Sequence, residues 1–184
     1  GESPTITFSE RNKLIAITRE ILPSHVSLLV GCATNDTSST IDLCLHAQEM
    51  QADGIVLVSP YYNVPTQKGL FTHFEKIALK TSLPIILYDH PTRTGVSLGE
   101  NLVLELAQIP NIVGIKEGSG NLERLNTLTS RLLETNTKLA IYSGVDEMNY
   151  PFLCLGAKGL ISVASNLTPT PLLTMLQACK DSNF

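Results

Sequence analysis

The chain has 184 residues, a hydrophobic content of 43% and a formal net charge of -4. This composition is typical of a soluble globular protein, and residues 1–184 are expected to form one domain with a substantial core. The 13 basic and 17 acidic residues are scattered singly, which gives no basic stripe for nucleic acid and no polybasic segment for a membrane. No apolar run reaches the length of a membrane span, so small molecules are the expected partners.

Helix and strand signals alternate along the whole chain. Thr7 and Glu10 stand at capping-box spacing and begin a first helix, which carries Leu14, Ile17 and Ile21 on one face. Capping residues at 35–36 introduce the second helix. The predicted strands are 26–33, 54–60, 84–89, 112–118, 138–143 and 159–164. The predicted helices after the first are 37–51, 66–81, 99–108, about 121–134, one that ends at 155 and one that begins at 170.

Each β-α unit is roughly 25 to 30 residues long, which suits parallel strands joined by crossover helices. Six such units fit either a doubly wound open sheet or part of a barrel. We favour the barrel, because no Gly-x-Gly-x-x-Gly phosphate loop follows a strand and because polar or aromatic residues follow several different strands. An eight-stranded barrel needs about 200 to 250 residues, so we expect an α/β chain that is a (β/α)8 barrel fragment without about the first one to two strands.

The cysteines and histidines give little support for a metal or a disulfide. The four cysteines are far apart and form no Cys-x-x-Cys pair, and the four histidines form no i, i+4 pair. We expect the cysteines to be reduced, buried residues of a cytoplasmic protein. They are Cys32, Cys44, Cys154 and Cys179.

Lys116 is the most informative candidate residue, because it interrupts an otherwise apolar strand. An ordinary lysine has a pKa near 10.4, so only about one amine in a thousand is neutral at neutral pH. Burial lowers this pKa and yields an amine that can attack a carbonyl carbon. The alternative is a lysine that reaches solvent or pairs with a carboxylate, although Glu117 points to the opposite face of the strand.

Tyr88 and Arg93 are the other candidates that the strand pattern brings near Lys116. Tyr88 ends the preceding strand and should share its inward face with His90, so its phenol could transfer protons to and from an imine. A strand tyrosine is otherwise usually a core residue with a satisfied hydroxyl. Arg93 follows in a loop, where its guanidinium could bind a carboxylate or simply be solvated. Tyr62, in a turn after an earlier strand, could equally be turn packing.

Taken together, the motifs are similar to those of a known family. In order and spacing they resemble the dihydrodipicolinate synthase and N-acetylneuraminate lyase family of pyruvate-dependent class I aldolases, from Gly1 to about Lys180. The motifs are Ser59-Pro60-Tyr61-Tyr62-Asn63-Val64-Pro65-Thr66, Leu87-Tyr88-Asp89-His90-Pro91-Thr92-Arg93-Thr94-Gly95, Gly114-Ile115-Lys116-Glu117-Gly118-Ser119-Gly120, and Ser143-Gly144 with Gly159-Leu160-Ile161-Ser162-Val163.

The resemblance implies a TIM barrel that continues into a C-terminal helical extension, and a Schiff base between Lys116 and the ketone of pyruvate. Tyr88 would be the general acid and base beside it. Tyr62 would complete a proton relay that reaches the neighbouring subunit's site in a homo-oligomer, a dimer of dimers. No metal or organic cofactor is implied. Four further positions would border the substrates, namely Gly1, Glu2, Gly144 and Ile161.

The resemblance also implies a second substrate. Arg93 matches the arginine that binds the carboxylate of aspartate semialdehyde, which favours condensation with pyruvate in lysine (diaminopimelate) biosynthesis. A dicarboxylate-like product needs a second cation, whereas a long sugar acid needs neutral donors. The alternatives are a related aldolase for sugar-derived 2-keto acids and a truncated, non-catalytic chain. Asp89-His90 replaces the family's usual Asn-Val, and either shifts the pKa of Tyr88 or faces the helices.

Overall fold

The computed structural model describes residues 2–181, which form one six-stranded parallel sheet with the strand order β1-β2-β3-β4-β5-β6. The strands are β1 (Leu29–Gly31), β2 (Gly54–Val58), β3 (Ile85–Asp89), β4 (Ile112–Glu117), β5 (Ala140–Ser143) and β6 (Gly159–Leu160). The helices are α1 (Phe8–Ile21), α2 (Thr37–Glu49), α3 (Gln67–Ala78), α4 (Pro91–Thr94), α5 (Glu100–Leu106), α6 (Leu122–Glu134), α7 (Asn149–Cys154) and α8 (Pro169–Lys180). Short 3-10 turns cover Ser3–Thr5, Asp146–Met148 and Ala164–Asn166.

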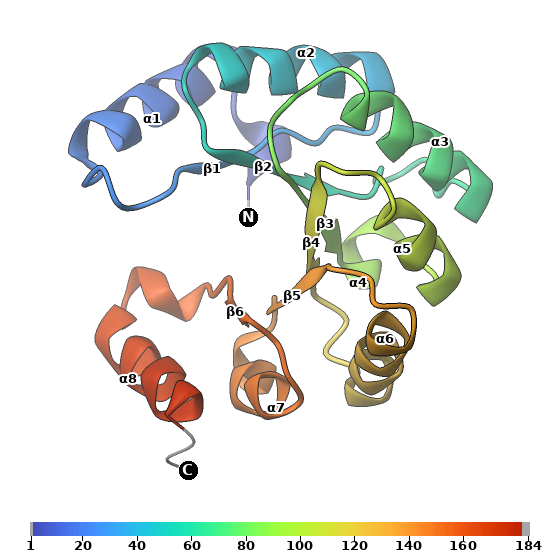
Figure 1. The fold of residues 1–184 in the computed structure, drawn as a ribbon. Helices are drawn as coiled ribbons and strands as arrows, with labels where there is room; N and C mark the ends of the chain where they lie inside the picture. The colour runs from blue at the N-terminus through green and yellow to red at the C-terminus, as the bar shows by residue number, and fades with distance from the viewer. Residues whose placement is uncertain (1, 182–184) are drawn as a thin grey trace.

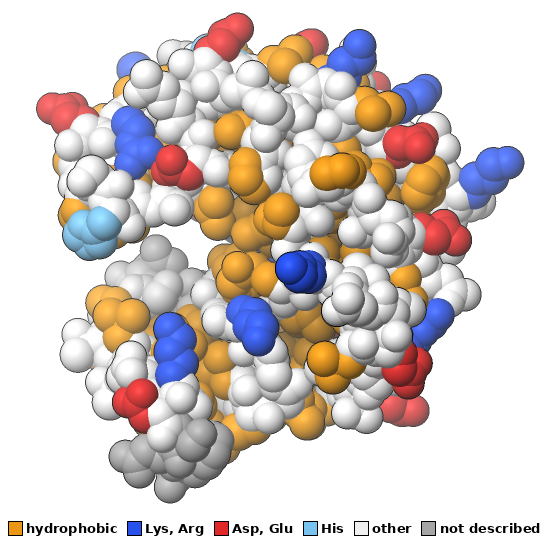
Figure 2. Space-filling model, in the orientation of Figure 1, with side chains coloured by type: hydrophobic (Ala, Val, Ile, Leu, Met, Phe, Trp, Pro, Cys, Tyr) orange, Lys and Arg blue, Asp and Glu red, His pale blue; other side chains and the backbone are white. Residues whose placement is uncertain are grey.

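The sheet curls with its helices on the outside, as in a barrel that is open on one side (Figure 1). Within residues 2–181, no strand bridges β1 and β6, which are the two ends of the sheet. Figure 2 shows a hollow on this open side, between the ends of the chain that carry α1 and α8. The prediction of a (β/α)8 barrel fragment is therefore confirmed, with six parallel strands.

Side-chain caps start several of the helices where the sequence predicts them. Thr7 Oγ1 accepts a hydrogen bond from the Glu10 backbone N–H at 3.3 Å, and the Glu10 carboxylate accepts one from the Thr7 N–H at 2.9 Å. This pair is the predicted capping box of α1. Asp36 caps α2 by accepting from the Ser39 N–H at 2.7 Å. These local bonds satisfy backbone donors that have no partner inside the helix.

The apolar face of α1 differs from the expected buried stripe. Leu14, Ile17 and Ile21 are 53%, 54% and 72% exposed, whereas Ile15 is buried. The helical periodicity is correct, but the face that packs on the sheet is another one. This occurs because α1 lies at the open end of the sheet, where no described element covers its second side (Figure 1).

The two terminal strands are also shorter than predicted. The sequence predicts strands at 26–33 and 159–164, but β1 has three residues and β6 has two. Each of them pairs on one side only, with β2 or with β5. Strand signals in the sequence measure apolar alternation, whereas strand length in the structure depends on hydrogen-bonded neighbours.

The core fills the space between the sheet and the helices. Its largest fully buried side chains include Phe74 of α3, Ile115 of β4 and Phe152 of α7. Cys32 and Cys44 are buried, as predicted. The same prediction is wrong for two cysteines of α7 and α8, because Cys154 is exposed and Cys179 is partly exposed. None of the described helices is long and apolar enough to cross a membrane.

Candidate active site

Lys116 and Tyr88 face each other on adjacent strands. The register of β3 and β4 pairs Tyr88 with Lys116, and the Lys116 Nζ lies 4.1 Å from the centre of the Tyr88 ring. Both residues stand near the C-terminal ends of their strands. Strand alternation and parallel pairing therefore bring the predicted amine and phenol together, as the sequence indicates.

A cavity of about 420 Å³ opens at this place. The predicted site residues Tyr88, Arg93 and Lys116 line it together with small apolar side chains, and within residues 2–181 no Asp or Glu is part of the lining. The site therefore suits a small acidic molecule, because its ionised groups are cationic. The lining residues are Ser3, Pro4, Gly31, Ala33, Val56, Val58, Tyr61, Tyr88, His90, Arg93, Thr94, Lys116 and Ile161.

The cavity changes the acidity of both central groups. Burial lowers the pKa of Lys116, and the more distant Asp146 carboxylate opposes this effect. Among the described residues, no carboxylate forms an ion pair with its ammonium. Burial raises the pKa of Tyr88, and the positive charge of Arg93 partly offsets this increase. A larger fraction of Lys116 is therefore neutral than for an exposed lysine, and the Tyr88 phenol beside it stays protonated at neutral pH.

Gly144 makes room for the Lys116 side chain. A Cβ at Gly144 would lie 2.9 Å from Lys116 Cε and 3.0 Å from the Glu117 carbonyl oxygen, closer than such atoms normally approach. The Gly144 N–H donates a hydrogen bond of 2.8 Å to that carbonyl, which holds the two segments together. Gly144 therefore touches the lysine itself, whereas Ile161 lies in the cavity wall.

Behind the cavity, a buried ion cluster joins β3 and β4 to α6. Arg124 donates to the Asp89 carboxylate at 2.8 Å, and its Nε lies 3.9 Å from Glu117. Both carboxylates are fully buried. Glu117 also accepts from the Ser119 N–H at 2.7 Å and hydroxyl at 2.8 Å. Asp89 also accepts from the Leu98 N–H at 3.2 Å.

Sequence reasoning missed Arg124, although a signal existed. Asp89 and Glu117 directly follow Tyr88 and Lys116, so alternation turns both carboxylates toward the helices. Two buried carboxylates on adjacent strands require a shared cation. An arginine in the first turn of the helix after β4 was the nearest candidate.

The Asp89 carboxyl gives a prediction for stability against pH. Burial raises its pKa from 3.8 to about 6, although Arg124 attracts the ionised form. The folded state thus holds this proton more tightly than the unfolded state, so the stabilising contribution is complete below pH 3.8 and is lost as pH rises through 6. Asp89→Asn cannot titrate. The unfolding free energy of the wild type minus that of Asp89→Asn should fall by on the order of 3 kcal/mol between about pH 4 and pH 7.

Urea unfolding of both proteins at a series of pH values measures this difference. A difference that stays constant with pH, or one that rises, would contradict the assignment. Because other carboxyl groups titrate in both proteins, only the difference between the two curves reports on Asp89.

The side chains of Asp89 and His90, at the end of β3, face opposite sides of the sheet. Asp89 faces α6, as described, whereas His90 faces the cavity and stacks on Tyr88, with ring centres 5.5 Å apart and an interplanar angle of 23°. Arg93 lies in the short helix α4, is exposed and also lines the cavity. Gly95 follows with a φ of 71°, a left-handed conformation that glycine adopts without steric cost.

Two predicted site residues, Tyr62 and Glu2, do not line the cavity, and a third lies outside the described residues. Tyr62 is 89% exposed with a φ of 71°, an uncommon conformation for a residue other than glycine, and it does not line the cavity. Glu2 is exposed, and its neighbours Ser3 and Pro4 line the cavity in its place. Gly1 lies outside the described residues. The roles predicted for these three residues stay predictions.

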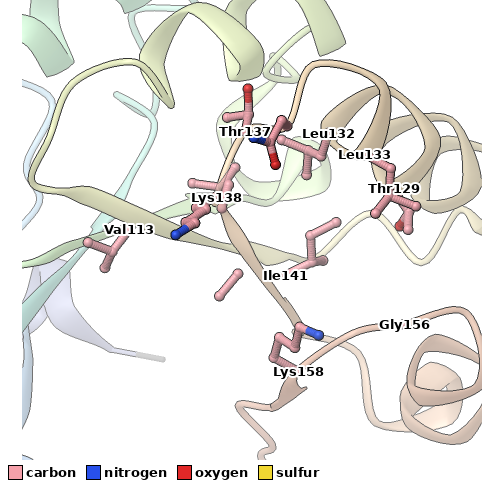
Figure 3. A pocket seen from close by; sticks show the side chains of 12 residues that line it. Val113, Thr129, Leu132, Leu133, Thr137, Lys138, Ile141, Gly156 and Lys158 are labelled. Carbon is pink, nitrogen blue, oxygen red and sulfur yellow. The ribbon is translucent and has the colours of Figure 1, made fainter.

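A second cavity of about 500 Å³ lies at the opposite ends of the strands (Figure 3). It is lined by the beginnings of β4 and β5 and by the end of α6, with Lys138 and Lys158 as its charged residues. It contains none of the predicted catalytic residues, so its size alone does not make it the active site. No cluster of His, Cys, Asp or Glu within residues 2–181 has the geometry to hold a metal ion.

Comparisons with known proteins find related sequences and structures. A model of the dihydrodipicolinate synthetase family matches residues 1–184. The 4-hydroxy-tetrahydrodipicolinate synthases of Syntrophobacter fumaroxidans and Persephonella marina are 39% and 41% identical to the chain. In each case the match covers the whole chain and 62% of the relative, so the chain spans less than two thirds of these proteins.

Solved structures of dihydrodipicolinate synthases are also similar to the chain. The crystal structure of dihydrodipicolinate synthase from Thermotoga maritima superposes with a TM-score of 0.95 at 35% identity. That of the chloride-inhibited enzyme from Acinetobacter baumannii, complexed with pyruvate, gives 0.94 at 37% identity. Both matches cover the whole chain and 62% of the other protein.

Proposed function

The chain belongs to the dihydrodipicolinate synthetase family, and we propose on that basis that it is part of a 4-hydroxy-tetrahydrodipicolinate synthase. This enzyme would be a class I aldolase-type lyase of lysine biosynthesis that condenses pyruvate with aspartate 4-semialdehyde. The observation that carries the proposal is the Lys116 amine 4.1 Å from the Tyr88 ring, in a cavity without carboxylates. The pyruvate complex of the similar Acinetobacter baumannii protein supports the choice of the first substrate.

The first half of the proposed reaction forms the nucleophile. The neutral Lys116 amine attacks the ketone carbon of pyruvate, and the resulting carbinolamine loses water with a proton supplied by Tyr88. The iminium then withdraws electrons from the pyruvate methyl group. A methyl proton leaves and an enamine forms, whose carbon is the nucleophile of the next step.

The second half joins the two substrates. The enamine carbon attacks the aldehyde carbon of aspartate semialdehyde, whose carboxylate Arg93 binds, and the aldehyde oxygen takes up a proton. The amine of the product then attacks the iminium carbon and displaces Lys116, which closes the ring and frees the enzyme. Gly144 and Ile161 would shape the pyruvate end of the cavity. This sequence of steps requires no metal or organic cofactor.

The proposal also includes the oligomeric state and the cellular location of the protein. Tyr62 would act across a dimer interface, which suits a side chain that is 89% exposed and away from its own cavity. A dimer of dimers and a cytoplasmic location stay predictions. Analytical ultracentrifugation of the wild type and of Tyr62→Ala would test the interface.

Trapping with borohydride tests the proposed chemistry directly. Pyruvate with borohydride should leave a reduced pyruvyl group on the peptide that contains Lys116, as mapped by mass spectrometry. The peptides with Lys138 and Lys158, from the second cavity, provide internal controls and should stay unmodified. An unmodified Lys116 would refute the Schiff-base assignment.

An aldehyde panel then tests the second substrate. Arg93→Ala should raise the KM for aspartate semialdehyde by about tenfold or more, because a charge-assisted hydrogen bond to its carboxylate is lost. The rate with an uncharged aldehyde should change little. If a sugar-derived aldehyde is the better acceptor and Arg93→Ala leaves its KM unchanged, the protein is the sugar-acid aldolase instead.

Gly144→Ala should slow formation of the pyruvate adduct by roughly 100-fold, because the new methyl group displaces the Lys116 side chain. Gly69→Ala is the matched control, since a Cβ there meets its nearest atom at an ordinary 3.4 Å and lies away from the cavity. The rate of borohydride-trapped adduct measures both. Equal rates for Gly144→Ala and the wild type would show that adduct formation by Lys116 does not depend on the space that Gly144 leaves.

A further inference from the structure

His90 is an ionisable residue of the cavity that the proposed reaction does not use. It lies one position beyond Asp89, at the point where the sequence departs from the Asn-Val usual in the family. Its ring lines the cavity together with Arg93 and Lys116. The imidazole therefore faces the cavity, where a substrate could bind, and does not face the helices.

Neighbouring groups hold the His90 ring in place. One face packs against the Tyr88 ring in a nearly parallel stack. The Nδ1 atom lies 3.3 Å from the Thr92 hydroxyl, in the first turn of α4. Gly118, directly after β4, leaves space beside the ring, since a Cβ there would lie 3.5 Å from the His90 Cβ and 3.0 Å from Tyr88 Cε2. A ring held by a stacked tyrosine and a neighbouring hydroxyl is preorganised to contact a ligand at little entropic cost.

The charges around His90 favour its neutral form. Burial lowers its pKa most, and the cations Arg93 and Lys116 lower it further. The Gly118 carbonyl and Glu117, which lies on the far side of β4, act in the opposite direction. The part of the lining that the structure describes contributes no carboxylate. An incoming carboxylate would thus offset the two cations and favour proton uptake by the imidazole.

We propose that His90 is a specificity-determining residue that binds the acidic group of the acceptor aldehyde together with Arg93. This inference rests on the proposed function and narrows it, because it restricts the acceptor to aldehydes that carry a carboxylate. A guanidinium and an imidazole that share one cavity provide two donors for the two oxygens of a carboxylate. An apolar side chain such as valine at this position would provide none.

Kinetics with His90→Val test the proposal. We expect the KM for aspartate semialdehyde to rise about tenfold, with a smaller effect on kcat, because a hydrogen bond to a charged group is lost. The KM of the wild type should increase as pH rises through the pKa of His90, because the imidazole loses its charge, and this dependence should be weaker in the variant. His25→Gln, on an exposed loop, is the control. A fall in kcat at unchanged KM would instead make His90 a support for Tyr88 and would overturn the proposal.

NMR gives a test that needs no turnover. The imidazole signals of the wild type are followed during a pH titration with and without malonate, and the His90 signal is assigned by its loss in His90→Val. Malonate should raise the pKa of His90. No response of His90 to malonate would overturn the inference.

The two tests also separate this inference from the proposed function. If pyruvate and borohydride modify Lys116 but His90→Val leaves the KM for the aldehyde unchanged, the aldolase assignment stands and only the role of His90 is wrong. If no adduct forms on Lys116, the proposed function fails, and the malonate titration still decides whether His90 belongs to an acid-binding site.

Discussion

Lys116→Ala is expected to abolish the pyruvate adduct and to lower turnover by on the order of 10⁴- to 10⁶-fold, as found when a covalent nucleophile is removed. Among the described residues, no other side chain that lines the cavity carries a primary amine. His90 and Arg93 cannot form the imine in its place. The loss should therefore exceed that of any other single substitution in the site.

Two further variants make this test specific. Lys116→Arg keeps the positive charge but provides no amine that can be neutral near pH 7, so it should be as inactive as Lys116→Ala. Lys158→Ala, in the second cavity, should keep its adduct and its activity. Circular dichroism checks that each variant is folded. A pyruvate adduct that persists in Lys116→Ala would show that another amine carries the chemistry.

Arg124→Met should destabilise the protein by about 3 to 5 kcal/mol, as expected when one partner of a buried ion pair is removed. The substitution keeps the apolar stem but leaves Asp89 and Glu117 buried without a cation. Glu100, 3.8 Å from the guanidinium, is partly exposed and should contribute less. The loss should be greater at pH 7 than at pH 5, because Asp89 can hold a proton at the lower pH.

Urea unfolding measures the effect, and Arg131→Met provides the matched control on the same helix. Arg131 forms no ion pair within residues 2–181, so its replacement should cost less than about 1 kcal/mol. The double variant Arg124→Met with Asp89→Asn should recover part of the loss, since one buried charge is removed with the cation. A loss below about 1 kcal/mol for Arg124→Met would show that the carboxylates do not depend on it.

The ion cluster also bears on the proposed reaction. Arg124 connects the residues that directly follow Tyr88 and Lys116, so it fixes the two strands relative to each other at the level of the cavity. Neither carboxylate touches the cavity, and neither is expected to take part in the chemistry. Their contribution is to position the amine and the phenol.

Local patterns in the sequence predict the order of the elements and the central pair of the site, Tyr88 and Lys116. The capping box at Thr7 and Glu10 depends on residues three apart, and strand alternation depends on a period of two, so both can be predicted from neighbours in the chain. The same alternation assigned Tyr88 and Lys116 to one face and Glu117 to the other. These are local rules, and the structure agrees with each of them.

Tertiary packing determines which surfaces are covered and which charges are buried. Whether Leu14 is exposed, how long β1 is and which cation meets Asp89 all depend on elements distant in the sequence. The lowered pKa of Lys116 likewise follows from the depth of the cavity, and not from the residues beside it in the strand. Burial and electrostatic interaction are properties of the packed chain, so local patterns predict candidates for a site while packing determines their chemistry.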